Sequence, residues 1–220
     1  GDKRRTEITH AVGDITMEDL IADDAVAITI SHLGYIKRTN LSEYKSQKRG
    51  GRGSQGSKTR DADFIEHMFV ASNHNYLLLF TEQGRCFWLR VYEIPEASKV
   101  AAGRVIQNII NLPQDDRVKA YIPIQDLNDE EFIKNNYIMF CTRQGTIKKT
   151  LVQDFSRPRS NGINAITIHE GDMLLEARLT NGNNEIIIAN RKGRAIRFNE
   201  SKVRSMGRNA ARVRVMTLVG

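Results

Sequence analysis

The chain has 220 residues, of which 40% are apolar and 27% are charged, a composition ordinary for a globular protein with a sizeable core. No apolar run of 18 residues occurs, which excludes a membrane-spanning helix within this sequence. The net charge of +7 is unevenly placed, because residues 1–24 hold seven acids and three bases while residues 25–220 have a net charge of +11. The strong positive charge of residues 25–220 predicts that the partner is a nucleic acid or an anionic membrane surface. The alternative is a soluble basic protein without such a partner.

Residues 1–24 are predicted to be an acidic arm or linker, because blocks of like charge usually stay solvated. Residues 25–220 are predicted to form one all-β body built from a recurring hairpin. In each copy an apolar run rich in β-branched or aromatic residues is followed by a turn with glycine and a second strand. The four hairpins cover residues 25–39, 76–90, 137–150 and 185–198, with turn glycines Gly34, Gly84, Gly145 and Gly193.

The turn glycines are 50, 61 and 48 residues apart, and the longest interval contains the acidic insert 125–131. A period of about 50 residues with several strands predicts a propeller-like β-pinwheel of four-stranded blades that pack on one another. A two-sheet sandwich is the alternative, but it does not explain the recurrence. We count about four repeats, and the last residues form a strand pattern with no partner after it. We therefore expect an incomplete set of blades and a piece of a longer protein.

Two further features recur in these repeats. A strand is predicted before each later hairpin and again at the end, at residues 64–70, 118–124, 173–179 and 213–218. A second glycine trails each hairpin, at position 50 or 51 and then at 103, 162 and 207. Leu78, Ile138 and Ile187 are predicted to be buried strand residues, because each lies in the middle of an apolar run.

One loop combines glycines with cations, and no acid occurs between residues 45 and 60. Glycine lets backbone amides approach a ligand closely, and arginine offers a planar fork of donors that matches phosphate oxygens. The loop therefore predicts contact with a polyanion backbone, although a flexible charged linker is the alternative. It consists of Gln47, Lys48, Arg49, Gly50, Gly51, Arg52 and Gly53, flanked by Lys45, Lys58 and Arg60.

Cations also recur near the turns and connections of the other repeats. If equivalent positions of a radial repeat point the same way, these side chains form a basic arc along one rim, which fits a bent polyanion and requires no base-edge readout. The predicted rim residues are Lys37, Arg38, Lys45, Lys58, Arg60, Arg85, Arg104, Lys148, Lys149, Arg157, Arg159, Arg191, Lys192, Arg194, Arg197, Arg204 and Arg208.

The sequence contains no phosphate loop, nucleophile elbow or metal-binding histidine pair, so we predict no catalytic and no metal-binding residues. Cys86 and Cys141 lie within apolar runs and are predicted to be buried free thiols. Trp88 occupies the position of Arg38, Lys149 and Arg197 in the other hairpins. We favour packing for this indole over stacking on a base.

The loop from Gln47 to Gly53 closely resembles the gyrase A box, the signature loop of the DNA gyrase A C-terminal domain family. The resemblance covers nearly the whole chain and includes residues 34–39, 59–61, 91–97 and 145–150. It implies a β-pinwheel that wraps duplex DNA around its basic rim, so that the holoenzyme introduces negative supercoils.

The resemblance also implies the rest of the assembly. The partners would be the gyrase B subunit and the N-terminal part of the gyrase A subunit, with two copies of each, in the bacterial cytoplasm. ATP and Mg²⁺ would act in the holoenzyme, with no cofactor in this piece, which we expect to be monomeric alone. The equivalent domain of topoisomerase IV, an Arg/Gly-type RNA-binding module and a protein-interaction propeller are the alternatives. The final stretch 211–216 lacks the glycine pair expected near Arg212 and Val215.

Overall fold

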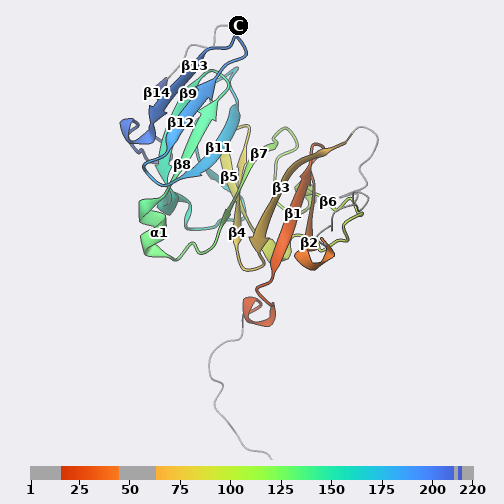
Figure 1. The fold of residues 1–220 in the computed structure, drawn as a ribbon. Helices are drawn as coiled ribbons and strands as arrows, with labels where there is room; N and C mark the ends of the chain where they lie inside the picture. The colour runs from red at the N-terminus through yellow and green to blue at the C-terminus, as the bar shows by residue number, and fades with distance from the viewer. Residues whose placement is uncertain (1–15, 45–62, 211–212, 215–220) are drawn as a thin grey trace, which may run out of the picture.

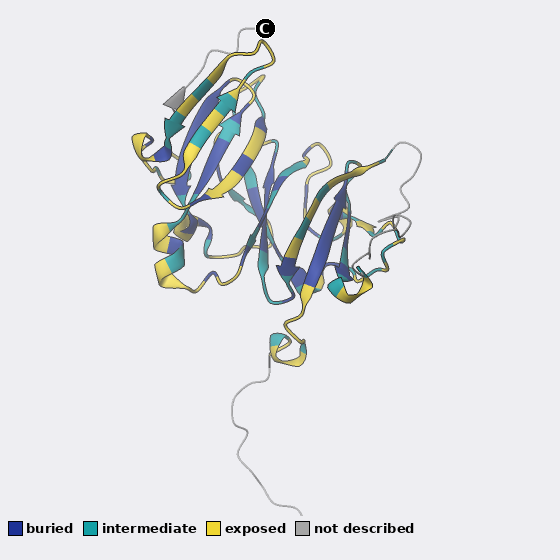
Figure 2. Cartoon of the chain, in the orientation of Figure 1, coloured by how far each residue is buried: buried dark blue, intermediate teal, exposed yellow. Residues whose placement is uncertain are grey.

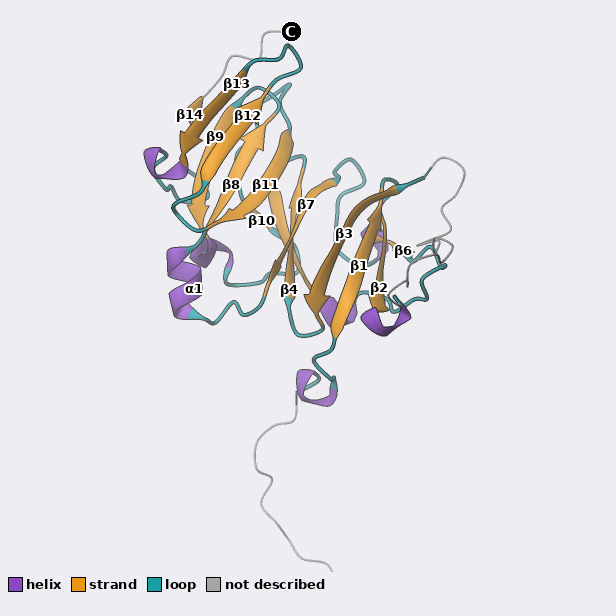
Figure 3. Ribbon diagram, viewed as in Figure 1, coloured by secondary structure: helices purple, strands orange, loops and turns teal. Residues whose placement is uncertain are grey.

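The computed structural model describes residues 16–44 and 63–210, and the backbone of residues 213–214. Its architecture is all-β, as predicted, with one short α-helix and several 3-10 turns (Figure 3). Four antiparallel hairpins follow one another along the chain and lie as adjacent blades in space (Figure 1). They join β1 (Ala25–Ser31) to β2 (Tyr35–Asn40), β4 (Tyr76–Thr81) to β5 (Arg85–Arg90), β8 (Tyr137–Thr142) to β9 (Thr146–Leu151), and β12 (Glu185–Ala189) to β13 (Ala195–Asn199).

Each of the first three hairpins gains a long strand from the segment that follows it. This strand pairs antiparallel with the first strand of its own hairpin before the chain enters the next blade. The predicted strands at 64–70, 118–124 and 173–179 therefore exist, and each completes the blade behind it. They are β3 (Ile65–Ser72), β7 (Val118–Ile124) and β11 (Leu174–Thr180).

The fourth strand of each complete blade comes from the next repeat. β6 (Arg104–Val105) follows the second hairpin but pairs with β2, and β10 (Ile163–Asn164) follows the third hairpin but pairs with β5. β14 (Val213–Arg214) likewise pairs with β9. The strand predicted at 213–218 is therefore present at residues 213–214, where it pairs with the preceding blade. Residues 215–220 lie outside the described part.

Short helical segments end the hairpins and fill one connection. The 3-10 turns that directly follow second strands are η2 (Leu41–Glu43), η3 (Val91–Glu93), η5 (Val152–Phe155) and η6 (Glu200–Lys202). Two others are η1 (Glu18–Leu20) in the arm and η4 (Ile106–Asn108) after β6. The acidic insert continues into α1 (Glu130–Asn135), which Asp129 caps by accepting a hydrogen bond from the Phe132 amide at 3.1 Å.

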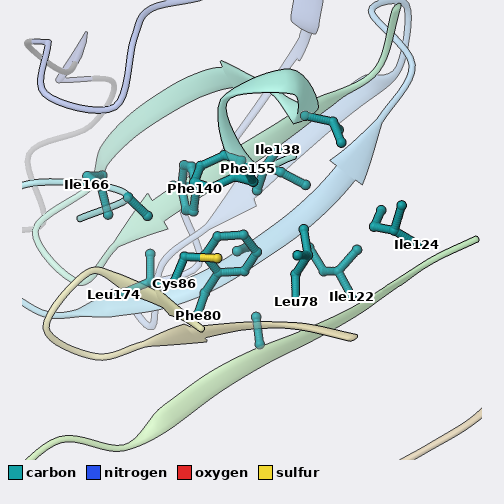
Figure 4. Packing of buried hydrophobic residues seen from close by; sticks show 14 of the residues in the cluster. Leu78, Phe80, Cys86, Ile122, Ile124, Ile138, Phe140, Phe155, Ile166 and Leu174 are labelled. Atoms are coloured by element: carbon teal, nitrogen blue, oxygen red, sulfur yellow. The ribbon is translucent and has the colours of Figure 1, made fainter. Parts of the chain in front are cut away.

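The core lies between successive blades. Leu78, Phe80, Ile138, Phe140 and Phe155 pack between the second and third blades, where the Phe80 ring meets those of Phe140 and Phe155 edge-on at 5.1 and 5.4 Å (Figure 4). The alternate residues of β4 face the first blade instead. β4 is thus buried on both faces, which explains its unbroken apolar sequence.

The fourth blade is different, because only two strands pair there among the described residues. Leu78 and Ile138 are fully buried, as predicted, but Ile187 is 68% exposed. Along β12 exposed and half-buried residues alternate (Figure 2), with Ile186 and Ile188 packing toward Met139 of the third blade. The prediction for Ile187 was wrong because no described blade covers the outer face of this hairpin.

Candidate nucleic-acid interface

The loop from Gln47 to Gly53, with Lys45, Lys58 and Arg60, falls within residues 45–62, which lie outside the described part of the chain. What the structure does describe is where this segment leaves and rejoins the fold. It begins after η2 and ends just before β3, so it connects the second and third strands of the first blade. The contacts of the loop remain a prediction.

Two of the predicted rim lysines are interior. Lys37 is 1% exposed, and its ammonium donates hydrogen bonds to the carbonyl oxygens of Ser98, Lys99 and Ala101 at 3.3, 2.7 and 2.8 Å. Burial lowers the pKa of this lysine, which the charge of Glu43 partly opposes. Lys148 is also 1% exposed, and it donates to the carbonyls of Ala165 and Arg208. The prediction that Lys37 and Lys148 contact DNA is therefore wrong.

The next position of the repeat, directly after Lys37 and Lys148, joins neighbouring blades. Arg38 donates from Nε to the carbonyl of Ile94 at 3.1 Å, and the Trp88 indole donates to that of Phe155 at 2.8 Å. Lys149, which is 6% exposed, donates to the carbonyl of Glu200 at 2.9 Å. Each acceptor lies in or directly after the 3-10 turn of the next blade.

Arg38, Trp88 and Lys149 thus each join adjacent blades through a backbone carbonyl. Trp88 packs, as predicted. The prediction of a rim contact is wrong for Lys149, because this lysine is buried. Arg38 is half-buried, and its two remaining nitrogens donate to Asn73 Oδ1 and the Tyr92 carbonyl at 3.2 and 3.5 Å. Because all three guanidinium nitrogens of Arg38 already donate hydrogen bonds, few donors remain for a phosphate.

Arg85 and Arg208 are half-buried and donate hydrogen bonds to the segment around the exchanged strand β10. Arg85 donates to the Asn161 carbonyl at 2.7 Å, and Arg208 donates to the Asn164 carbonyl at 3.0 Å. Both acceptors lie in or beside the short strand β10. Their role as rim contacts stays a prediction.

The remaining predicted cations are exposed. Most of them lie in the connections that run from one blade to the previous one or at the turn of the fourth hairpin, and Arg197 lies on β13. Arg197, 70% exposed, also pairs with Glu185 at 3.2 Å, and hydrogen bonds from Asn199 and Arg197 hold the pKa of that carboxyl low. The exposed set is Arg104, Arg157, Arg159, Arg191, Lys192, Arg194, Arg197 and Arg204.

Sequence reasoning missed Arg90, at the end of β5. Its guanidinium lies 3.9 Å from the centre of the Tyr76 ring and 3.0 Å from a carboxylate oxygen of Glu18 in the arm. The signal was present in the repeat, because the equivalent positions in the first and fourth hairpins are Asn40 and Asn199, which cap the following 3-10 turns.

The described residues give no support for a metal site or a membrane-spanning helix. No three His, Cys, Asp or Glu side chains among them lie close enough together to hold a metal ion. No helix in residues 16–44 or 63–210 is long and apolar enough to cross a bilayer. Both cysteines are free, Cys86 buried and Cys141 half-buried, and burial raises the pKa of each thiol.

The fold defines the class of protein: a β-pinwheel, whose propeller-like blades exchange one short strand with the next repeat. The family model described as "DNA gyrase C-terminal domain, beta-propeller" matches residues 27–72, 75–125, 136–181 and 184–218, one segment for each blade. This chain belongs to that family.

Known proteins agree with the assignment. The A subunit of DNA gyrase from Haemophilus influenzae is 44% identical over 218 residues, which is 99% of this chain and 24% of that protein. The chain thus spans about a quarter of the length of such relatives. A crystal structure of the C-terminal domain of DNA topoisomerase IV is 32% identical with a TM-score of 0.73, covering 90% of this chain and 59% of that one. A DNA gyrase A C-terminal domain structure, 24% identical over 84% of this chain and 58% of that one, has a TM-score of 0.65 and supports the fold.

Proposed function

We propose that this chain is the non-catalytic, DNA-wrapping domain of a gyrase A subunit. It binds duplex DNA along the exposed cations and bends it, so that the holoenzyme introduces negative supercoils. The observation that carries the proposal is the position of these cations in the connections between blades, which lets one DNA path meet several repeats. Such contacts neutralise phosphates and need no base reading.

The assembly around this domain follows from the same proposal. The partners are the gyrase B subunit and the N-terminal part of the gyrase A subunit, in a complex with two copies of each in the bacterial cytoplasm. Strand cleavage, ATP and Mg²⁺ belong to those other parts. The chain itself supplies a shaped, positively charged surface.

The first test is the salt dependence of binding to a short duplex without a preferred sequence. Each phosphate neutralised contributes about 0.9 to the slope of log affinity against log salt concentration, so several contacts give a slope of several units. A flat response, or much tighter binding to one short sequence than to bulk DNA, contradicts the proposal. Single-stranded RNA is the competitor that separates it from an RNA-binding module, which prefers unpaired bases.

Bending is tested separately. The chain is bound to a nicked circular plasmid, the nick is sealed, and the linking number is measured after protein removal. Wrapping with a fixed hand shifts the linking number in proportion to the bound protein. Binding without any shift supports a DNA-binding domain that does not wrap.

A second candidate is the equivalent domain of topoisomerase IV, favoured by the solved structure with a TM-score of 0.73. The intact Gln47–Gly53 loop and the 44% identity to a gyrase relative favour the first candidate. Supercoiling by the parent enzyme separates them, because the topoisomerase IV alternative predicts relaxation and decatenation without negative supercoiling.

A further inference from the structure

A cavity of about 540 Å³ lies where the acidic arm meets the second blade. Three segments line it: the arm at 16–18, the β4–β5 hairpin with its 3-10 turn, and the loop 158–160 of the third repeat. Its lining combines aromatic faces with two cations and, in Glu18 and Glu93, two carboxylates. The aromatic faces and the guanidinium groups suit phosphate and nucleoside chemistry rather than an apolar ligand. Tyr76, Trp88, Arg90, Tyr92 and Arg159 contribute these groups.

Arg90 is the fixed anion-binding group of this cavity. Its side chain is 21% exposed, and Nη1 donates to the His74 carbonyl at 2.9 Å while the guanidinium covers the Tyr76 ring. The remaining edge meets the Glu18 carboxylate, with Nη2 at 3.0 Å and Nη1 at 3.4 Å. A guanidinium fork binds a carboxylate and a phosphate in the same two-pronged way, so Glu18 occupies the place of a phosphate.

The repeat shows that Arg90 is not needed to end its strand. At the equivalent position Asn40 accepts a hydrogen bond from the Ser42 amide, and Asn199 accepts one from the Ser201 amide. Arg90 makes no such cap for η3. Its side chain is therefore committed to the cavity rather than to the local turn.

The arm is attached to the blades at two separable places. Residues 21–24 are fixed through Asn73 and His74, which donate to the carbonyl of Ala22 at 2.9 Å and to the Asp23 carboxylate at 3.0 Å. The η1 turn beyond them is exposed, with Met17 and Leu20 at 69% and 72% exposure. The Glu18 carboxylate also lies 3.8 Å from His74 Nδ1, so His74 contacts both places. The hydrogen bonds that anchor Ala22 and Asp23 do not involve Glu18, so they can persist when Glu18 leaves Arg90.

The loop 158–160 brings a residue of the proposed DNA path to the cavity. Arg159, one of the exposed cations of that path, lines the cavity together with Arg90. A DNA phosphate bound at Arg159 would therefore lie at the same cavity as Arg90.

We propose that this cavity is a phosphodiester-binding site of the DNA path, and that Glu18 occupies it when DNA is absent. The arm then competes with one DNA phosphate for Arg90 and weakens binding. This inference rests on the proposed function, and it assigns the arm a regulatory contact as well as a linking role.

The test measures the affinity of the 220-residue chain for a short duplex at low salt. We expect Glu18→Gln to raise the affinity about two- to fivefold, the range that release of one exposed ion pair allows. Asp24→Asn is the matched control, because it removes the same charge from an exposed arm residue that makes no contact with Arg90. We expect this control to change the affinity by less than half of that amount.

Two further measurements separate a specific contact from a general charge effect. In an Arg90→Gln background, Glu18→Gln should no longer change the affinity. If Arg90→Gln does not fold, Arg90→Lys keeps the charge but loses the fork, and it should reduce the effect of Glu18→Gln. Trp88 is the single tryptophan of the sequence and lines the cavity, so its fluorescence should change when DNA displaces Glu18.

The outcomes are distinguishable. Equal gains from Glu18→Gln and Asp24→Asn, or an undiminished Glu18→Gln effect without Arg90, overturn this inference while leaving DNA binding intact. If the unaltered chain binds no duplex at low salt, the proposed function falls and this inference falls with it.

Discussion

Cationic side chains that occupy the same kind of sequence repeat differ widely in their exposure to solvent. Lys149 and Lys192 both lie in the hairpin repeat, yet the first is 6% exposed and the second lies on the surface. Lys149 is accommodated because its ammonium meets the Glu200 carbonyl, the Tyr137 ring at 4.7 Å and, at 4.0 Å, the Glu200 carboxylate. A buried ammonium is tolerated only with such partners.

Replacing Lys149 by methionine is expected to destabilise the chain by about 1–3 kcal/mol, because the Glu200 carbonyl and carboxylate lose a buried donor. Lys202→Met, at an exposed position of the neighbouring fourth blade, should stay within about 0.5 kcal/mol. Urea denaturation measures both. DNA affinity should change no more for the first variant than for the second, and a larger loss would restore Lys149 as a DNA contact.

Alanine substitutions in the three similar apolar runs should not be equivalent. Leu78→Ala and Ile138→Ala are expected to cost about 2–5 kcal/mol each, because both side chains are fully buried between blades. Ile187→Ala should cost less than about 0.5 kcal/mol, because its side chain is 68% exposed. Thermal or urea unfolding of the three variants checks the order, and a large loss at Ile187 would mean that this face is covered in solution.

At the scale of elements, the exchanged strands make each blade depend on the next repeat. β6 and β10 can reach the preceding blade only because the chain turns sharply before them, at Gly103 and Gly162, whose φ angles are +89° and +70°. A Cβ on Gly103 would lie 2.4 Å from the Ile36 carbonyl oxygen, so the backbones must approach closely there. Gly207 trails the fourth hairpin but differs from Gly103 and Gly162, because its φ is not positive and an added Cβ would meet no atom of the described residues within 4 Å.

Gly103→Ala is therefore expected to destabilise the chain by at least about 2 kcal/mol, through left-handed backbone strain and the contact with Ile36. Gly207→Ala is its matched control and should lie within about 0.5 kcal/mol of the unaltered chain. Denaturation midpoints give the comparison. Equal midpoints for both variants would show that the exchanged strand β6 contributes little to stability.

Across the whole molecule, positive charge is spread over several repeats rather than concentrated in one loop. The Gln47–Gly53 loop holds three cations, Lys48, Arg49 and Arg52, of the 30 in residues 25–220. Most of the affinity for DNA should therefore come from other contacts, while the glycines of the loop allow a close backbone approach at one point of the path.

Replacing residues 47–53 by alanines should weaken DNA binding by no more than about tenfold, or about 1.4 kcal/mol. In the parent enzyme, the same replacement is expected to abolish negative supercoiling but preserve relaxation and decatenation. Plasmid topology gels resolve these activities, with the unaltered enzyme as control. Supercoiling at the normal rate would show that the loop is only a linker.

The repeat, its hairpins and their turn glycines could be predicted from the sequence, because they depend on local backbone preferences and on apolar runs that recur at a nearly constant period. The sequence also indicated Leu78 and Ile138 as core residues and Trp88 as a packing residue. The folded arrangement was needed to show which blade each connecting strand joins, why Ile187 is exposed, and which cations are interior. Those outcomes depend on contacts between repeats. The sequence around a lysine or an isoleucine does not indicate whether another blade will cover that side chain.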